Sequence, residues 1–181
     1  MNITRYHIEG LLSYVPAVFT DDRGAFMETF NEQQFAEAVG KKTIFVQDNQ
    51  SVSRLNVLRG LHFQEPPHAQ GKLVRVLKGR VLDIAVDLRR NSPTYGQHVA
   101  VELSGENQVV FWVPEGFAHG FVTLEEGSVF AYKCTGFYNK NSERCIQWND
   151  PTLGIDWRVA NPLLSEKDAV GMAFNTYNSP F

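Results

Sequence analysis

The sequence of 181 residues has few of the features that mark secreted, membrane or metal-cluster proteins. Its only two cysteines, Cys134 and Cys145, lie too far apart for a C-x-x-C redox or zinc motif. No apolar run is long enough to cross a bilayer, and residues 1–7 lack the apolar core of a signal peptide. We therefore predict a cytoplasmic protein whose thiols are reduced.

A net positive charge is also absent, because the formal charge is -3 at pH 7. Non-specific binding to nucleic acid or to a membrane surface favours a clearly basic protein, so we expect neither partner. Low-complexity segments, internal repeats and linkers are missing as well. The length suits one well-packed domain and is short for two, which predicts a single domain over residues 1–181.

Helical patterns are scarce, and the dominant local signal is the short strand. Three pairs of segments rich in β-branched residues, each joined by a turn, are predicted as hairpins. They are 72–77 with 81–88, 97–103 with 108–113, and 117–124 with 129–134. Such a succession of short strands is typical of a sandwich or barrel and not of βαβ units. The sequence thus predicts an all-β fold.

Two short helices complete this prediction. Asn31 as an N-cap and Gly40 as a stop enclose apolar residues at helical spacing. Residues 165–168, Ser-Glu-Lys-Asp, resemble a variant of the capping box and predict a short helix near the C-terminus.

Two polar segments carry side chains that a plain barrel does not need. One is Leu-Arg-Gly-Leu-His-Phe-Gln at 58–64, closely followed by Gln-Gly-Lys at 70–72. The other spans 114–121, and its Pro-x-Gly-x-x-His spacing resembles the second motif of the cupin superfamily. In cupins this motif directs its histidine into a jelly-roll barrel, where it usually binds a metal together with an earlier His-x-His motif.

The earlier cupin motif is incomplete in this chain. Gln64 occupies the place of its second histidine, which leaves His62 and His119 alone. A catalytic metal usually needs three nitrogen or carboxylate ligands, and glutamine is a poor ligand for transition metals. We therefore predict that no metal is bound and that these histidines serve acid–base chemistry.

The order of motifs along nearly the whole chain resembles the dTDP-4-dehydrorhamnose 3,5-epimerase family of the dTDP-L-rhamnose pathway. The matching segments are 19–28, 47–51, 58–62, 70–76, 87–89, 92–96, 114–121, 132–133, 148–151 and 164–168. Each segment is weak by itself, whereas their order together is specific. The resemblance implies a cupin-like jelly-roll barrel with a few short peripheral helices, no cofactor, and a homodimer that exchanges N-terminal strands.

The family's substrate has a ketone at C4, which makes the hydrogens on C3 and C5 acidic. Inversion then needs a base on one face, an acid on the other and cations around the enolate oxygen. By matching position, the resemblance implies His62 as the base and Tyr132 as the acid. It implies that Lys72, together with Arg59, stabilises the enolate. Asp168 would orient His62.

The resemblance also implies a set of substrate-binding residues, with Tyr138 stacking on the thymine ring. Arg23 and Glu28, on the exchanged strands, would complete the neighbouring subunit's site. The full set is Arg23, Glu28, Gln47, Asp48, Asn49, Arg59, Lys72, His119, Tyr138, Glu143 and Lys167. Arginine suits a pyrophosphate because its fork donates two hydrogen bonds.

Without the resemblance, ordinary structural roles fit these residues: packing for His62, barrel filling for Tyr132 and helix capping for Asp168. Two other functions stay open. A related 3-epimerase or 5-epimerase of a dTDP-deoxysugar pathway would use the same base and acid, and segment 134–137 departs from the family pattern. A non-catalytic sugar-binding cupin would lack the base or the acid, and this chain has both.

Overall fold

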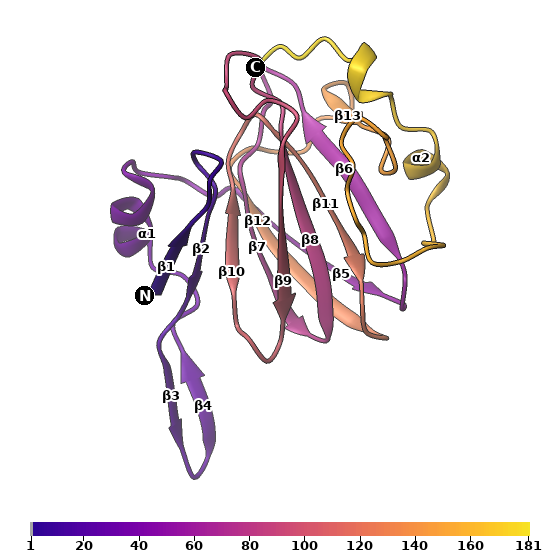
Figure 1. The fold of residues 1–181 in the computed structure, drawn as a ribbon. Helices are drawn as coiled ribbons and strands as arrows, with labels where there is room; N and C mark the ends of the chain where they lie inside the picture. Colours follow the sequence, from indigo (N-terminus) through magenta and orange to yellow (C-terminus); the bar gives the residue numbers. More distant parts are fainter. Residues whose placement is uncertain (1) are drawn as a thin grey trace.

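A computed structural model describes residues 2–181 and confirms the predicted all-β class. Most of the strands form two antiparallel sheets that face each other, and β3 (Val18–Asp21) and β4 (Gly24–Met27) form a separate two-stranded sheet (Figure 1). The six-stranded sheet has the order β1 (Asn2–Arg5), β2 (Leu12–Val15), β10 (Val110–Val113), β7 (Lys72–Lys78), β12 (Ser128–Cys134) and β5 (Gln47–Ser53). The five-stranded sheet has the order β13 (Glu143–Cys145), β6 (Leu58–Gln64), β11 (Phe117–Thr123), β8 (Arg80–Asp87) and β9 (His98–Ser104).

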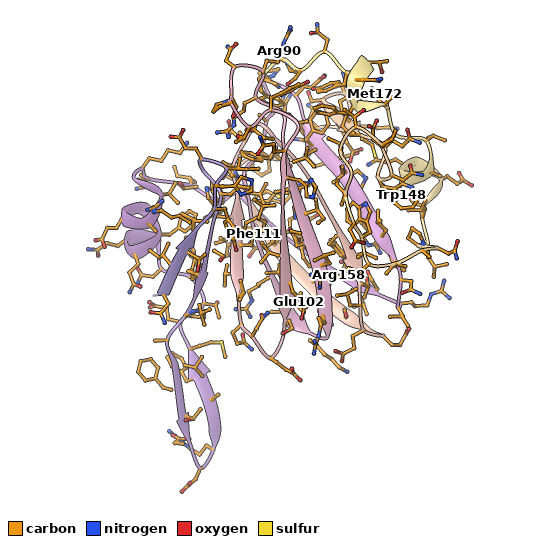
Figure 2. The ribbon with its side chains drawn as sticks, viewed as in Figure 1. Arg90, Glu102, Phe111, Trp148, Arg158 and Met172 are labelled. Atoms are coloured by element: carbon orange, nitrogen blue, oxygen red, sulfur yellow. The ribbon has the colours of Figure 1, made fainter. Side chains whose placement is uncertain are left out.

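Three apolar clusters hold these layers together. The first fills the space between the sheets around Phe111, which is fully buried (Figure 2). The second lies on the other face of the five-stranded sheet, where the C-terminal segment covers it with Trp157 and Phe174. Arg158 of this segment also contacts Glu102 of β9 through an ion pair of 3.2 Å (Figure 2). The third joins the outer face of the six-stranded sheet to the helix that contains Phe35.

The predicted strands are confirmed, but the three predicted hairpin pairings are wrong. β7 and β8 lie in different sheets, as do β9 and β10, and β11 and β12. Each of these tight connections therefore crosses from one sheet to the other. β8 pairs instead with β9 and β11. Every residue of β8 after the first is buried, because one face meets the inter-sheet core and the other meets the C-terminal segment.

Both predicted helices are present. In α1 (Glu32–Val39), the Asn31 side chain accepts hydrogen bonds from two backbone amides, and Gly40 ends the helix in the left-handed conformation at φ 79°. α2 (Glu166–Ala169) begins at Ser165, whose hydroxyl accepts from the Asp168 amide. A 3-10 helix, η1 (Phe174–Thr176), follows. Within residues 2–181, no helix has the length and apolar character needed to cross a membrane.

A hairpin of β3 (Val18–Asp21) and β4 (Gly24–Met27) projects from the body as an arm (Figure 1). Its side chains stand clear of both sheets (Figure 2). Phe19 and Phe26 face each other across the two strands and are 63% and 70% exposed. Two aromatic rings on an isolated hairpin are an unusual exposed apolar surface.

Two glycines bring β6 and β11 unusually close together beside the polar segments. A Cβ on Gly60 would lie 2.6 Å from the Gly120 Cα, and Gly60 has a φ of +143°. The register of the two strands shifts immediately after His119. Only residues without a side chain permit this approach, which places His62 and His119 directly opposite each other.

Candidate active site

The polar side chains of the two sheets converge on one cavity of about 360 Å³. His62 comes from β6, His119 from β11, Lys72 from β7, Tyr132 from β12 and Asp168 from α2. Asn49 and Arg59 also line the cavity, and the Arg59 guanidinium donates to the Ser53 hydroxyl at 3.3 Å. The structure therefore brings together the four residues predicted to be catalytic, which come from distant parts of the sequence.

His62 and Asp168 form a hydrogen-bonded pair at the edge of the cavity. The distance from His62 Nε2 to Asp168 Oδ1 is 2.5 Å, and the second carboxylate oxygen accepts from the Ser165 hydroxyl at 2.7 Å. The same Ser165 hydroxyl caps α2, so the helix start fixes the carboxylate that holds the imidazole. The Asp168 carboxylate thus contacts both the residue that caps α2 and the imidazole of His62.

The electrostatics of this pair leave the imidazole neutral and the carboxylate charged. Burial lowers the pKa of His62 and outweighs the opposing effect of Asp168. Burial alone would raise the pKa of Asp168, but the hydrogen bonds from His62 and Ser165 hold it below its ordinary value. With Nε2–H donated to Asp168, Nδ1 is the nitrogen left to accept a proton.

Lys72 and Tyr132 lie on the opposite sheet. Lys72 begins β7, and burial lowers the pKa of its ammonium group. Tyr132 lies in the middle of β12, where burial is the main cause that raises the pKa of its hydroxyl. A raised pKa keeps the phenol protonated at neutral pH, while the nearby charge of Arg59 favours the phenolate. The hydroxyl can therefore act as a proton donor facing the imidazole across the cavity.

His119 forms a second hydrogen-bonded pair, with a residue that no sequence motif marks. Its Nε2 lies 2.9 and 3.0 Å from the two carboxylate oxygens of Asp83. Burial raises the pKa of Asp83, whereas the hydrogen bond from His119 opposes that shift. Asp83 in the middle of the mostly apolar segment 81–88 was the available signal, because a buried carboxylate is costly without a partner.

A smaller pocket of about 90 Å³ adjoins the cavity and shares Asn49, His62, Lys72 and Tyr132 with it. Gln47, Tyr138 and Glu143, all predicted to bind substrate, line this second pocket. The Tyr138 hydroxyl donates to Glu143 at 3.1 Å, and Glu143 also forms an ion pair with Lys167. Burial would raise the pKa of Glu143, but the contact with Lys167 holds it below the ordinary value.

Three predicted substrate-binding residues line neither the cavity nor the smaller pocket. Asp48 points to the outer face of the sheet, where it pairs with Lys133 at 3.0 Å, because alternate residues of β5 face opposite sides. Arg23 lies at the tip of the arm with its side chain 90% exposed and paired with Asp21. Glu28 follows β4 and lines a separate surface pocket with Phe19 and Tyr14.

One cluster near the cavity has the composition of a metal site. Donor atoms of His62, Cys145 and Asp168 lie within 4.8 Å of one another. This cluster is not the metal site of the cupin motifs, which would combine His62 with His119. Burial raises the pKa of the Cys145 thiol to about 12, and His62 and Asp168 already bond to each other. The absence of a bound metal stays a prediction, and elemental analysis of the purified protein tests it.

Comparison with known proteins gives one consistent family. Residues 5–176 match the profile described as dTDP-4-dehydrorhamnose 3,5-epimerase. The enzyme of that name from Shigella flexneri is 53% identical over 174 residues, covering 96% of each chain. The crystal structure of the enzyme from Elizabethkingia anophelis NUHP1 is 50% identical, covers 97% of each chain and gives a TM-score of 0.93.

A further structure was solved with a sugar nucleotide. It is a dTDP-6-deoxy-D-glucose-3,5-epimerase from Legionella pneumophila Philadelphia 1 in complex with dTDP-4-keto-L-rhamnose. It is 48% identical, covers 98% of this chain and 94% of its own, and gives a TM-score of 0.94. These matches extend over almost the entire length and agree with the fold. The chain belongs to the dTDP-4-dehydrorhamnose 3,5-epimerase family.

Proposed function

We propose that this chain converts dTDP-4-dehydro-6-deoxy-D-glucose to dTDP-4-dehydro-L-rhamnose by inverting C3 and C5, without a cofactor. The observation that carries the proposal is one cavity with a hydrogen-bonded imidazole on one wall and a half-buried lysine and tyrosine on the other. A sugar-binding cupin without catalytic activity has no need for this arrangement. The ketone itself accepts the electron pair, so the reaction needs acid–base groups and charge only.

In the proposed mechanism, His62 Nδ1 removes the proton from the carbon next to the ketone. The electron pair of that C–H bond forms the enolate, whose oxygen charge the Lys72 ammonium stabilises in the water-poor cavity. Tyr132 then donates its hydroxyl proton to the opposite face of the same carbon. The imidazolium and the phenolate return to their starting forms by exchange with solvent, and the sequence repeats at the second carbon.

The smaller pocket is the proposed site of the nucleotide. Tyr138, 56% exposed at the pocket rim, would stack on the thymine ring. Lys167 and Arg59 supply positive charge on the wall of the catalytic cavity, and Lys167 also pairs with Glu143 of the smaller pocket, in a chain whose net charge is negative. Local cations therefore suffice for the diphosphate. The free, buried thiols of Cys134 and Cys145 support a reducing, cytoplasmic setting.

The arm supports the further proposal of a homodimer in which each subunit completes its partner's site. Phe19 and Phe26 would be buried by the partner, and Arg23 would reach the partner's diphosphate, where a charged hydrogen bond contributes about 1.5–3 kcal/mol. Arg23→Ala is thus expected to weaken substrate binding by roughly 10- to 100-fold.

Mixed dimers test this arrangement directly. At a substrate concentration well below KM, Arg23→Ala subunits are expected to retain about 1–10% of the activity and His62→Ala subunits almost none. A mixture restores activity, because one site of each mixed dimer has both residues. If Arg23 acts within its own subunit, both sites of every mixed dimer stay defective and mixing restores nothing.

Incubation with the keto sugar nucleotide in deuterated water, followed by NMR, tests the reaction itself. Deuterium at both C3 and C5 of the product is expected. Exchange and inversion at one carbon only would replace the proposal by a related 3-epimerase or 5-epimerase. The absence of exchange at both carbons would refute epimerase function for this substrate.

A further inference from the structure

The inner face of strand β5 is polar at every position. Gln47, Asn49, Ser51 and Ser53 are buried or half-buried, whereas the residues between them are exposed. A strand inside a two-sheet core normally places apolar residues on its inner face, and burial of polar groups is costly unless they have partners. This row therefore requires an explanation.

Three of the four side chains have a hydrogen-bond partner in the protein. The Gln47 amide donates to Asn49 at 2.9 Å, the Asn49 amide contacts the Cys134 sulfur at 3.6 Å, and the Ser53 hydroxyl accepts from Arg59. The Ser51 hydroxyl oxygen is buried and has no partner among residues 2–181. Among residues 2–181, the Thr43 hydroxyl is the only other buried side-chain polar group without a hydrogen-bond partner.

The two hydroxyls differ in their surroundings. Ser51 lines the catalytic cavity together with His62, Lys72 and Tyr132, and lies opposite Phe130 of β12. Thr43 lies in the segment between α1 and β5 and lines none of the described pockets that form the site. Ser51 also lines only the larger cavity, whereas Tyr138 and Glu143 line only the smaller one.

We propose that Ser51 is a substrate-binding residue whose hydroxyl forms a hydrogen bond with a ring hydroxyl of the sugar. Rotation about its Cα–Cβ bond turns the oxygen from its buried position toward the cavity, where it can donate and accept. The unpartnered hydroxyl destabilises the free protein, and the bond to the sugar removes this penalty on binding. The proposal rests on the proposed epimerase function and adds a determinant of sugar recognition to it.

Removal of the Ser51 hydroxyl is expected to leave the folded protein at least as stable as the wild type but to lower its activity. Ser51→Ala is expected to lower kcat/KM about 5- to 10-fold, which corresponds to the loss of one neutral hydrogen bond. Its affinity for dTDP alone should stay unchanged, and its Tm should be equal or higher by roughly 2–4 °C. Ser51→Thr keeps the hydroxyl and should retain more activity than Ser51→Ala.

Thr43→Val is the matched control, because it removes the other unpartnered hydroxyl. It should raise or preserve the Tm without changing kcat/KM. Calorimetry with dTDP-glucose, which lacks the ketone and cannot react, separates binding from turnover. Weaker binding of dTDP-glucose, with dTDP binding unchanged, supports the proposal even if wild-type protein fails to epimerise the keto sugar. Unchanged dTDP-glucose affinity, or an equal loss for dTDP and dTDP-glucose, would overturn it.

Discussion

His62→Ala is expected to abolish proton exchange at both C3 and C5, with kcat reduced by a factor of about 10² to 10⁴ or more. In the proposed mechanism one imidazole serves both carbons, and it is held by a 2.5 Å hydrogen bond to Asp168. Asp168 keeps its bond to Ser165, so α2 remains capped in the variant. Binding of dTDP should be largely retained, because Tyr138 and Glu143 lie in the adjoining pocket.

Deuterium incorporation followed by NMR, together with dTDP calorimetry, measures both consequences. His98→Gln serves as a control, since His98 lies on β9 and lines neither pocket. If His62→Ala still exchanges the proton at C3 or C5, another group is the base at that carbon. His119, which lines the same cavity, is then the first candidate.

The pH dependence of the wild-type protein provides an independent check on the same residue. Only the neutral imidazole accepts a proton, and burial lowers the pKa of His62. Activity is therefore expected to fall as the pH drops through this lowered pKa, which places the acidic limb of kcat/KM below the ordinary imidazole value of about 6.5. An acidic limb above that value would contradict a desolvated base.

Tyr132→Phe is expected to separate proton exchange from inversion. The substitution keeps the ring that packs on Phe130, with centroids 6.0 Å apart, and removes only the proton donor. His62 can still form the enolate and return a solvent-derived proton to the same face. We expect deuterium in recovered starting sugar, while formation of the inverted product falls by about 10² to 10⁴.

Mass spectrometry of the recovered substrate and NMR of the product give the ratio of exchange to inversion. Tyr14→Phe is a matched control, because the Tyr14 hydroxyl donates to the Thr29 carbonyl on the outer face of the sheet. Its ratio should equal that of the wild type. If Tyr132→Phe inverts at the wild-type rate, the acid is a different group. If it shows no exchange at all, Tyr132 is required for enolate formation.

The sequence by itself determined the local structure of this protein. Alternating and β-branched segments located the strands, and Asn31, Gly40 and Ser165 marked helix ends, because these signals depend only on neighbouring residues. The motif order identified the family and the residues that the cavity brings together. Asp168 was predicted both as a capping residue and as a partner of His62; the structure shows the contact with His62, whereas the cap of α2 is the Ser165 hydroxyl, which accepts from the Asp168 amide.

Only the tertiary structure decided which strands pair and which side chains meet. The three predicted hairpins failed because a short turn can either pair two strands or cross between sheets, and burial on both faces selects the crossing. Asp83 was missed because its partner His119 is distant in sequence, and the hydrogen bond exists only where β8 and β11 pair. The unpartnered state of Ser51 likewise depends on every neighbour that the fold places around it. Contacts of this kind join residues far apart in the chain, so no local pattern encodes them.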